Sequence, residues 1–154
     1  MAKQETILIA DDAQINRAIL RNLFEDDYNL LEAENGETAL LLLRQYQESI
    51  AAVLLDLIMP VKNGYEVLEE MRRERRLYHV PVVVITAEDS TDNRVKVFEM
   101  GASDIIAKPF EPAVVRSRVN NIIELGRYRR NLEALVEEKS AQVRESNAAV
   151  IDML

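Results

Sequence analysis

Cysteine is absent from the 154-residue sequence, and histidine occurs only once. The absence of cysteine excludes a disulfide framework, a thiolate metal site and a cysteine nucleophile, and it makes a reducing cytosol the natural setting. The single histidine, His79, lies just before Val80 and Pro81 at the start of an apolar run, where we expect a packing or surface role. The chemistry of this protein must therefore come from other side chains.

Long apolar segments and an excess of positive charge are also missing. No run approaches the roughly 18 apolar residues of a membrane span, and the apolar part of the N-terminal stretch MAKQETILIA is too short for a signal peptide. The formal net charge is -8, so the long-range field disfavours nonspecific binding to nucleic acid or to an anionic membrane. We therefore expect a cytoplasmic protein with neither nucleic acid nor membrane as a partner.

Short apolar runs alternate five times with longer stretches of helical period, which is typical of a parallel sheet flanked by helices. The first, third and fourth runs are almost continuously apolar, and this indicates strands that are covered on both faces. Right-handed crossovers favour an α/β fold, a doubly wound, flavodoxin-like (βα)5 three-layer sandwich with strand order 2-1-3-4-5. The expected strands are residues 5–10, 28–33, 51–56, 80–85 and 103–107.

Helical spacing and capping residues support the helices between these strands. Ile15, Ile19 and Leu23 recur at intervals of four, which predicts a first helix after the first strand. Asn63 stands three residues before Glu66, the spacing of a capping box, and this predicts the start of the third helix.

The composition changes after about residue 124. From there on the chain has no proline, one glycine and many Glu, Arg, Lys, Gln and Ala residues, so we expect the fifth helix to continue as an extended helix. We therefore expect a domain over residues 1–124 and a helical connector over 125–154. The apolar residues at the end of the chain suggest an output domain beyond it.

The connector carries a heptad pattern. Val136, Val143 and Val150 stand seven residues apart, and β-branched residues at this position favour a parallel two-stranded coiled coil. Arg129, Lys139 and Ser146 interrupt the apolar seam, so a single solvated or frayed helix is the alternative. The pattern predicts a homodimer through this helix.

Polar side chains follow four of the expected strands. The run ILIA ends on Asp11 and Asp12, AAVLL on Asp56, VPVVVI on Thr86 and DIIA on Lys108. The carboxyl ends of parallel strands meet at one edge of a sheet, so we expect these side chains to share a crevice. Carboxylate oxygens suit Mg²⁺, and an ionised carboxylate can attack a phosphoryl group to form an acyl phosphate. The ammonium of Lys108 can then neutralise phosphoryl oxygens, and the hydroxyl of Thr86 can bind one.

Each residue also has an ordinary structural explanation. An acid after a strand is a common helix N-cap, which is the alternative for Asp11 or Asp12 taken alone. Thr86 can be a simple turn residue, and Lys108 can be a solvated lysine before Pro109. Their joint occurrence at successive strand ends favours the shared site.

Residues 5 to 124 resemble the receiver domain of bacterial two-component response regulators, through the motifs LIADD (8–12), LLDLIMPVKNG (54–64), VVVITA (82–87) and GASDIIAKPF (101–110). The resemblance implies that Asp56 is the phosphoacceptor. It also implies that Asp12 binds Mg²⁺ directly, that Asp11 acts at the metal largely through water, and that the backbone carbonyl of Ile58 is a further ligand.

The resemblance assigns the remaining polar residues as well. Thr86 corresponds to the switch hydroxyl, and Lys108 to the lysine that pairs with phosphate and precedes a cis peptide bond to Pro109. One position departs from the pattern, because the family usually places Tyr or Phe three residues before the lysine and this chain has Ile105. The usual rotation of an aromatic side chain cannot operate here.

These features predict a signalling phosphoacceptor rather than an enzyme. A sensor histidine kinase would phosphorylate Asp56, and the face of the fourth helix, fifth strand and fifth helix would transmit the change and offer a second route to dimers. One alternative is a receiver-fold dimerisation scaffold, because Ile105 weakens coupling. Another is an aspartyl phosphatase, which generally needs an acid where this chain has Ile58. The connector resembles helices that precede HD-GYP-type phosphodiesterase domains, and similar helices precede GGDEF cyclase domains.

Overall fold

The computed structural model describes residues 5–153 and places side chains as far as Arg144. The chain divides into two compact units, Met1–Ile123 and Glu124–Leu154. None of the described helices combines the length and the apolar character that a membrane span requires. The cytoplasmic location stays a prediction.

The first unit alternates strands and helices, as the sequence predicts. Its sheet is parallel throughout and has the order β2-β1-β3-β4-β5, so the predicted fold class and strand order are confirmed. The elements are β1 (Thr6–Ala10), α1 (Gln14–Phe24), β2 (Asn29–Ala33), α2 (Gly36–Tyr46), β3 (Ile50–Leu55), α3 (Gly64–Arg73), β4 (Val82–Thr86), α4 (Thr91–Glu99), β5 (Asp104–Ala107) and α5 (Pro112–Met153).

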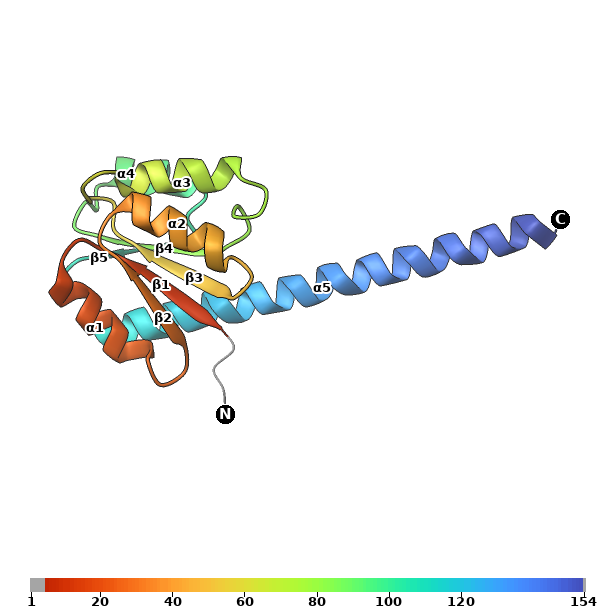
Figure 1. Cartoon of the computed structure of the whole chain (residues 1–154), viewed down its shortest axis with the longest axis horizontal. Helices are drawn as coiled ribbons and strands as arrows, with labels where there is room; N and C mark the ends of the chain where they lie inside the picture. The colour runs from red at the N-terminus through yellow and green to blue at the C-terminus, as the bar shows by residue number, and fades with distance from the viewer. Residues whose placement is uncertain (1–4, 154) are drawn as a thin grey trace. The chain divides into compact units, whose positions relative to one another are not determined.

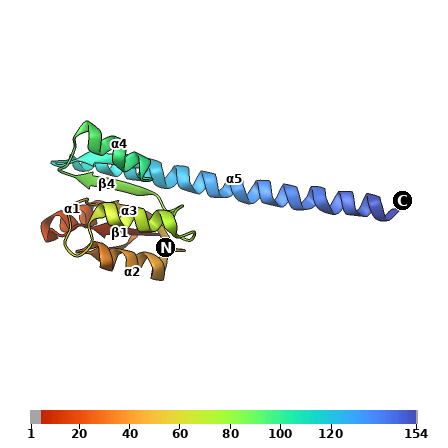
Figure 2. The same ribbon diagram turned by 90° about the horizontal axis from the view of Figure 1, so that it is seen from above.

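Helices cover both faces of the sheet and form three layers. Leu8 and Ala10 of β1 pack in one apolar cluster with residues of α2, α3 and α4, whereas Ile7 and Ile9 pack in a second cluster with α1 and the first part of α5. Figure 1 shows α2, α3 and α4 on one side of the sheet and α1 on the other. Figure 2 shows the same elements from above. This alternation follows from the two-residue period of a strand.

The register of the central strands aligns the ends that carry the polar residues. Ala10 of β1 lies opposite Leu55 of β3, and the backbone N–H of Asp56 donates to the carbonyl oxygen of Ala10 at 2.9 Å. Asp11 and Asp56 therefore start from adjacent points of the same sheet edge.

Helix α1 forms where the spacing predicts it, but a different face is buried. Leu20 and Phe24 are 2% and 1% exposed, whereas Ile15 is 72% exposed and Ile19 is 41% exposed. Ile15 lies about 140° from Leu20 around the helix at 100° per residue. The helix packs on the sheet through Leu20 and Phe24, so apolar spacing alone predicted the helix but not its buried face.

The predicted capping box at the start of α3 is present. The side chain of Asn63 accepts a hydrogen bond from the backbone N–H of Glu66 at 2.9 Å, and the Glu66 carboxylate accepts one from the backbone N–H of Asn63 at 3.2 Å. This reciprocal pair satisfies two N–H groups that the first helical turn leaves without partners.

Val61, in the loop between β3 and α3, has a φ of 67° and is 69% exposed. A β-branched residue is disfavoured in this left-handed region, whereas asparagine tolerates it. We expect Val61→Asn to raise the free energy of unfolding by about 1 kcal/mol in urea denaturation. Val95→Asn, an exposed position within α4, is the control and should give no gain.

The second unit is helical and belongs to α5. The apolar side chains of Leu125, Leu132, Val136 and Val143 are between 50% and 59% exposed. Val150, the last member of the predicted heptad series, lies beyond the described side chains. The exposed stripe has the spacing of a coiled-coil seam, and coiled-coil pairing stays a prediction.

Candidate functional site

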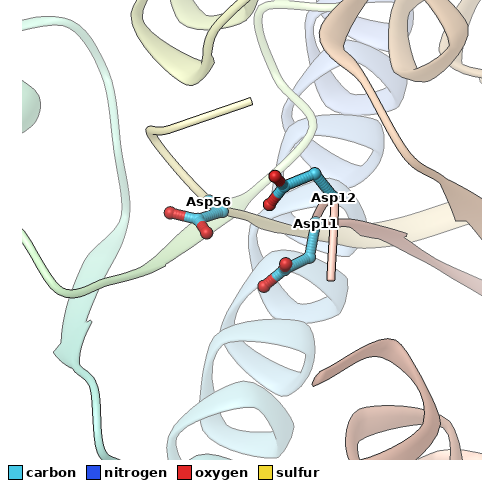
Figure 3. Close-up of side chains that lie close together, drawn as sticks. All are labelled: Asp11, Asp12 and Asp56. Atoms are coloured by element: carbon cyan, nitrogen blue, oxygen red, sulfur yellow. The ribbon is translucent and has the colours of Figure 1, made fainter. Parts of the chain in front are cut away.

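Three carboxylates meet where β1 and β3 end. Asp11, Asp12 and Asp56 each place one oxygen so that these atoms lie within 4.8 Å of one another, and Figure 3 shows the three side chains at this edge of the sheet. Asp11 is 2% exposed and Asp56 is 7% exposed, whereas Asp12 is open to solvent. The structure thus brings together the three acids that the sequence predicted.

Lys108 reaches into this cluster from the end of β5. Its Nζ donates to Asp11 Oδ2 at 2.8 Å and to Asp56 Oδ2 at 2.7 Å, and the peptide bond to Pro109 is cis. Burial lowers the pKa of Lys108, but the hydrogen bonds to Asp11 and Asp56 outweigh burial and hold the pKa above its ordinary value. The ammonium therefore stays charged and offsets the repulsion between two buried carboxylates.

Asp11 and Asp12 lie in different surroundings. Asp11 Oδ1 accepts from the backbone N–H of Ala13 at 2.8 Å, and Oδ2 accepts from Lys108 and, at 3.4 Å, from Asn16 Nδ2. Within the described residues, the Asp12 carboxylate makes no such hydrogen bond. The N-cap of α1 is Ala13 and no side chain caps the helix, so neither acid is an N-cap. Asp12 has the carboxylate with more capacity for an added ligand.

Thr86 is the last residue of β4, and Ile58 lies in the loop after β3. The Thr86 side chain is fully buried, and its Oγ1 accepts a hydrogen bond from the backbone N–H of Glu88 at 3.2 Å. The backbone N–H of Ile58 donates to Asp56 Oδ1 at 3.3 Å, which holds this peptide beside the carboxylate. A role for the Ile58 carbonyl as a metal ligand stays a prediction.

The family follows from a comparison of the whole domain with known proteins. The model of the response regulator receiver domain matches residues 7–120. The chain belongs to this family. The match covers β1 from Ile7 onward and the other four strands, with both aspartates after β1, Asp56, Thr86 and Lys108.

Curated proteins similar to this receiver differ in their names and in the share of their length that the chain matches. Histidine kinase P4 of Formosa agariphila is 38% identical over 79% of the chain and 9% of its own length. Probable transcriptional regulator ycf29 of Pyropia yezoensis is 34% identical over 76% and 52%. A probable cyclic di-GMP phosphodiesterase of Vibrio cholerae is 35% identical over 79% and 27%. The chain thus spans at most about half the length of these relatives.

Solved structures support the same assignment. A putative response regulator from Chloroflexus aurantiacus has a TM-score of 0.72 and 31% identity over 79% of this chain and 99% of that one. The Mn²⁺-bound form of the response regulator Rcp1 has a TM-score of 0.65 and 26% identity over 77% and 91%. The chain is therefore similar in fold to response regulators of known structure.

Arg17 is a residue of the receiver site that sequence reasoning missed. Its Nη1 donates to the backbone carbonyl of Asp11 at 2.7 Å, its Nε donates to Glu32 at 3.2 Å, and its side chain is 13% exposed. The guanidinium therefore fixes the peptide that carries the acidic pair and adds positive charge beside it. A basic residue five positions after Asp12, on the helix that follows the acids, was the available signal.

We expect Arg17→Ala to lower the free energy of unfolding by about 2 kcal/mol, because a charge-assisted hydrogen bond to a carbonyl next to the buried acids is lost. Arg21→Ala is the matched control, since Arg21 is 47% exposed and pairs with the same Glu32. An exposed pair contributes at most about 1 kcal/mol. Urea denaturation of both variants checks the prediction, and equal losses would contradict it.

The donor set fits a small hard cation. Three carboxylates from two adjacent strand ends place oxygens close enough for one ion to contact them, and oxygen is the ligand that Mg²⁺ prefers. Asp11 and Asp56 together face one ammonium, so a divalent cation would further offset the negative charge of the cluster. The site therefore has the composition of a magnesium site beside a candidate nucleophile.

Proposed function

We propose that this receiver is a phosphoacceptor switch in which Asp56 takes a phosphoryl group from a sensor histidine kinase. The observation that carries the proposal is the Lys108 ammonium, which lies between Asp11 and Asp56 at hydrogen-bonding distance from both. A carboxylate beside a cation, at the open end of a parallel sheet, is suited to attack an incoming phosphorus atom.

The reaction exchanges one bond to phosphorus for another. An oxygen of Asp56 attacks the phosphorus, the bond from phosphorus to the donor nitrogen breaks, and the electron pair leaves with the imidazole of the kinase. Asp11, Asp12, Asp56 and the Ile58 carbonyl would hold Mg²⁺, which supplies charge neutralisation at the phosphoryl oxygens. Lys108 exchanges a carboxylate partner for a phosphoryl oxygen and remains charged throughout.

An apolar groove beside Lys108 gives a kinase a surface from which to reach Asp56. Ile19 of α1, Ala87 after β4 and Phe110 after β5 contribute to its lining, together with Lys108 itself. Ile15, on the same helix, adds an exposed apolar side chain. Exposed apolar surface next to a reactive group is typical of a protein contact rather than of a solvent-facing helix.

The proposed switch transmits the change away from Asp56. The Thr86 hydroxyl donates a hydrogen bond to a phosphoryl oxygen, and its movement alters the loop before α4. The α4-β5-α5 face and the connector over residues 125–154 then change their contacts or pairing. We propose the boundary of the receiver at residue 124, next to the division between the two compact units.

The partner side of the proposal includes a second copy of this chain. The exposed stripe of the connector and the α4-β5-α5 face are the two surfaces that we propose for homodimers. We also propose that an output domain, such as a cyclic di-GMP phosphodiesterase, follows the connector in the full-length protein. The similar protein of Vibrio cholerae is named a probable cyclic di-GMP phosphodiesterase.

Mass spectrometry of the intact protein tests the phosphoacceptor. With Mg²⁺ and acetyl phosphate, or with a cognate kinase, we expect one phosphate adduct on the wild type and none on Asp56→Asn. Asp26→Asn, an exposed acid outside the cluster, is the control and should retain the adduct. An adduct that persists unchanged in Asp56→Asn would overturn the assignment.

A receiver-fold dimerisation scaffold is the second candidate, and Ile105 favours it. This residue is 2% exposed and packs within the apolar cluster beneath α2, α3 and α4, so it cannot rotate as a polar aromatic switch would. Sedimentation and α4 amide exchange, with and without the phosphate mimic beryllofluoride, separate the two candidates. Changes on loading support the switch, whereas unchanged association and exchange support the scaffold.

A further inference from the structure

Glu88 connects the candidate site to two helices. Its backbone N–H donates to Thr86 Oγ1 at 3.2 Å. Its carboxylate oxygen Oε2 accepts a hydrogen bond from the Tyr65 hydroxyl at 3.1 Å and another from Asn93 Nδ2 at 3.4 Å. One residue of the loop after β4 thus contacts the buried hydroxyl, the first turn of α3 and the first turn of α4.

Tyr65 is held firmly at its end of this connection. Its ring packs against the apolar core as a partly buried side chain, and Lys96 Nζ of α4 lies 4.5 Å from the ring centroid. Burial and the hydrogen bond to Glu88 raise the pKa of the Tyr65 hydroxyl. The hydroxyl therefore remains a proton donor to Glu88 across the neutral range, and the ring adds a cation–π contact to α4.

This connection offers a coupling route in a receiver that has Ile105 in place of the usual aromatic residue. The Ile105 side chain has no polar group and is buried. It can therefore neither donate a hydrogen bond to Thr86 nor move in response to the Thr86 hydroxyl. Among the described residues, Glu88 is the one whose hydrogen bonds join Thr86 to α4. A signal that starts at the Thr86 hydroxyl therefore has a physical route through Glu88.

We propose that Tyr65 and Glu88 form a latch that holds the loop before α4 in its unphosphorylated position, and that phosphorylation of Asp56 opens it. This inference rests on the proposed function. When the Thr86 hydroxyl turns to a phosphoryl oxygen, the Glu88 peptide that is bonded to Thr86 Oγ1 shifts with it. The new negative charge also repels the Glu88 carboxylate. The hydrogen bond from Tyr65 to Glu88 breaks, and α4 loses the link to α3 that runs through Glu88.

The latch makes Tyr65 and Glu88 positioning residues rather than catalytic ones. A contact present only in the unphosphorylated state must weaken binding of any ligand that favours the other state, because the two equilibria are linked. Removing the contact should therefore change the affinity for such a ligand in one direction only. Ligands that mimic the phosphoryl group should bind more tightly once the latch is gone, although Tyr65 touches none of the acids.

Beryllofluoride binding in the presence of Mg²⁺ tests whether the affinity rises as the latch predicts. We expect Tyr65→Phe, which keeps the ring and removes only the hydroxyl, to bind beryllofluoride about fivefold more tightly than wild type. Amide exchange of α4 in the unloaded variant should rise toward the level of loaded wild type. Tyr78→Phe is the matched control, since Tyr78 is 66% exposed and lies outside the latch, and it should behave as wild type.

A double-variant comparison separates the latch from a general effect of charge. Glu88→Gln removes a negative charge near the site as well as the strong acceptor, so its own effect is not specific. In the Glu88→Gln background, however, Tyr65→Phe should add little. The same fivefold gain in both backgrounds would overturn the latch, and so would an unchanged affinity in Tyr65→Phe. A wild type without Asp56-dependent beryllofluoride binding would overturn the proposed function and the latch together.

Discussion

Replacing Lys108 by methionine is expected to lower the free energy of unfolding by about 3 kcal/mol at neutral pH without divalent cations. Methionine keeps most of the length of the side chain and removes the charge. Asp11 and Asp56, which are 2% and 7% exposed, then face each other without the ammonium that lies 2.8 Å and 2.7 Å from their oxygens. Breaking a buried pair in this way leaves charges without compensation.

Lys62→Met provides the matched control for this loss. Lys62 pairs with Glu70 at 2.9 Å on the surface, where the two side chains are 33% and 31% exposed. Water screens that pair, so its removal should cost less than about 1 kcal/mol. Urea denaturation in EDTA measures both variants, and similar losses would show that the Lys108 pair is no more important than a surface pair.

The Lys108 variant should also respond differently to Mg²⁺ and to pH. Loss of the ammonium makes the cluster more negative, so added Mg²⁺ should restore more stability to Lys108→Met than it adds to wild type. Because the pKa of Lys108 is raised above 10.5 in the folded state, its stabilisation is complete below that pH and is lost as the pH rises through the raised value. The difference between wild type and variant should therefore shrink in strongly alkaline solution.

Replacing Gly64 by alanine is expected to lower the free energy of unfolding by about 3 kcal/mol and to weaken beryllofluoride binding. A Cβ at this position would lie 2.4 Å from the carbonyl oxygen of Asp56 and 2.7 Å from the Cα of Leu57. Both are backbone atoms, so no side-chain rotation can relieve the overlap. The start of α3 or the end of β3 must move, and movement at the end of β3 displaces Asp56.

Gly126→Ala is the control for the exchange of glycine for alanine as such. Gly126 lies inside α5, where alanine favours the helix by up to about 1 kcal/mol. This variant should retain both stability and beryllofluoride binding. A Gly64→Ala protein with wild-type stability and affinity would contradict the close approach between α3 and the Asp56 peptide.

Local patterns in the sequence predicted most of the fold because each depends on neighbouring residues alone. The apolar runs placed all five strands to within two residues, and the capping box at Asn63 and Glu66 placed the start of α3. The family motifs then named Asp56 and Lys108. The same patterns were a poor guide to α1, since Ile15 has helical spacing but lies in solvent.

The convergence of the acids and the lysine followed from a rule about sheets rather than from any local pattern. Parallel strands end at one edge, so polar residues after successive strands had to meet there. Which atoms pair is a separate matter. The contact of Arg17 with the Asp11 carbonyl and that of Tyr65 with Glu88 join residues on different elements. The position of Arg17 five residues after Asp12 was a weak signal for the first contact, whereas no spacing indicates the second.

The sequence by itself determined the family, the order of strands and helices, and the residues at the sheet edge, because periodicity and motif spacing are properties of the chain. Only the tertiary structure decided which face of α1 is buried, why residue 64 must lack a side chain, and that Glu88 joins Thr86 to α3 and α4. Those features depend on how closely packed elements approach one another, and that distance is set by all the side chains between them.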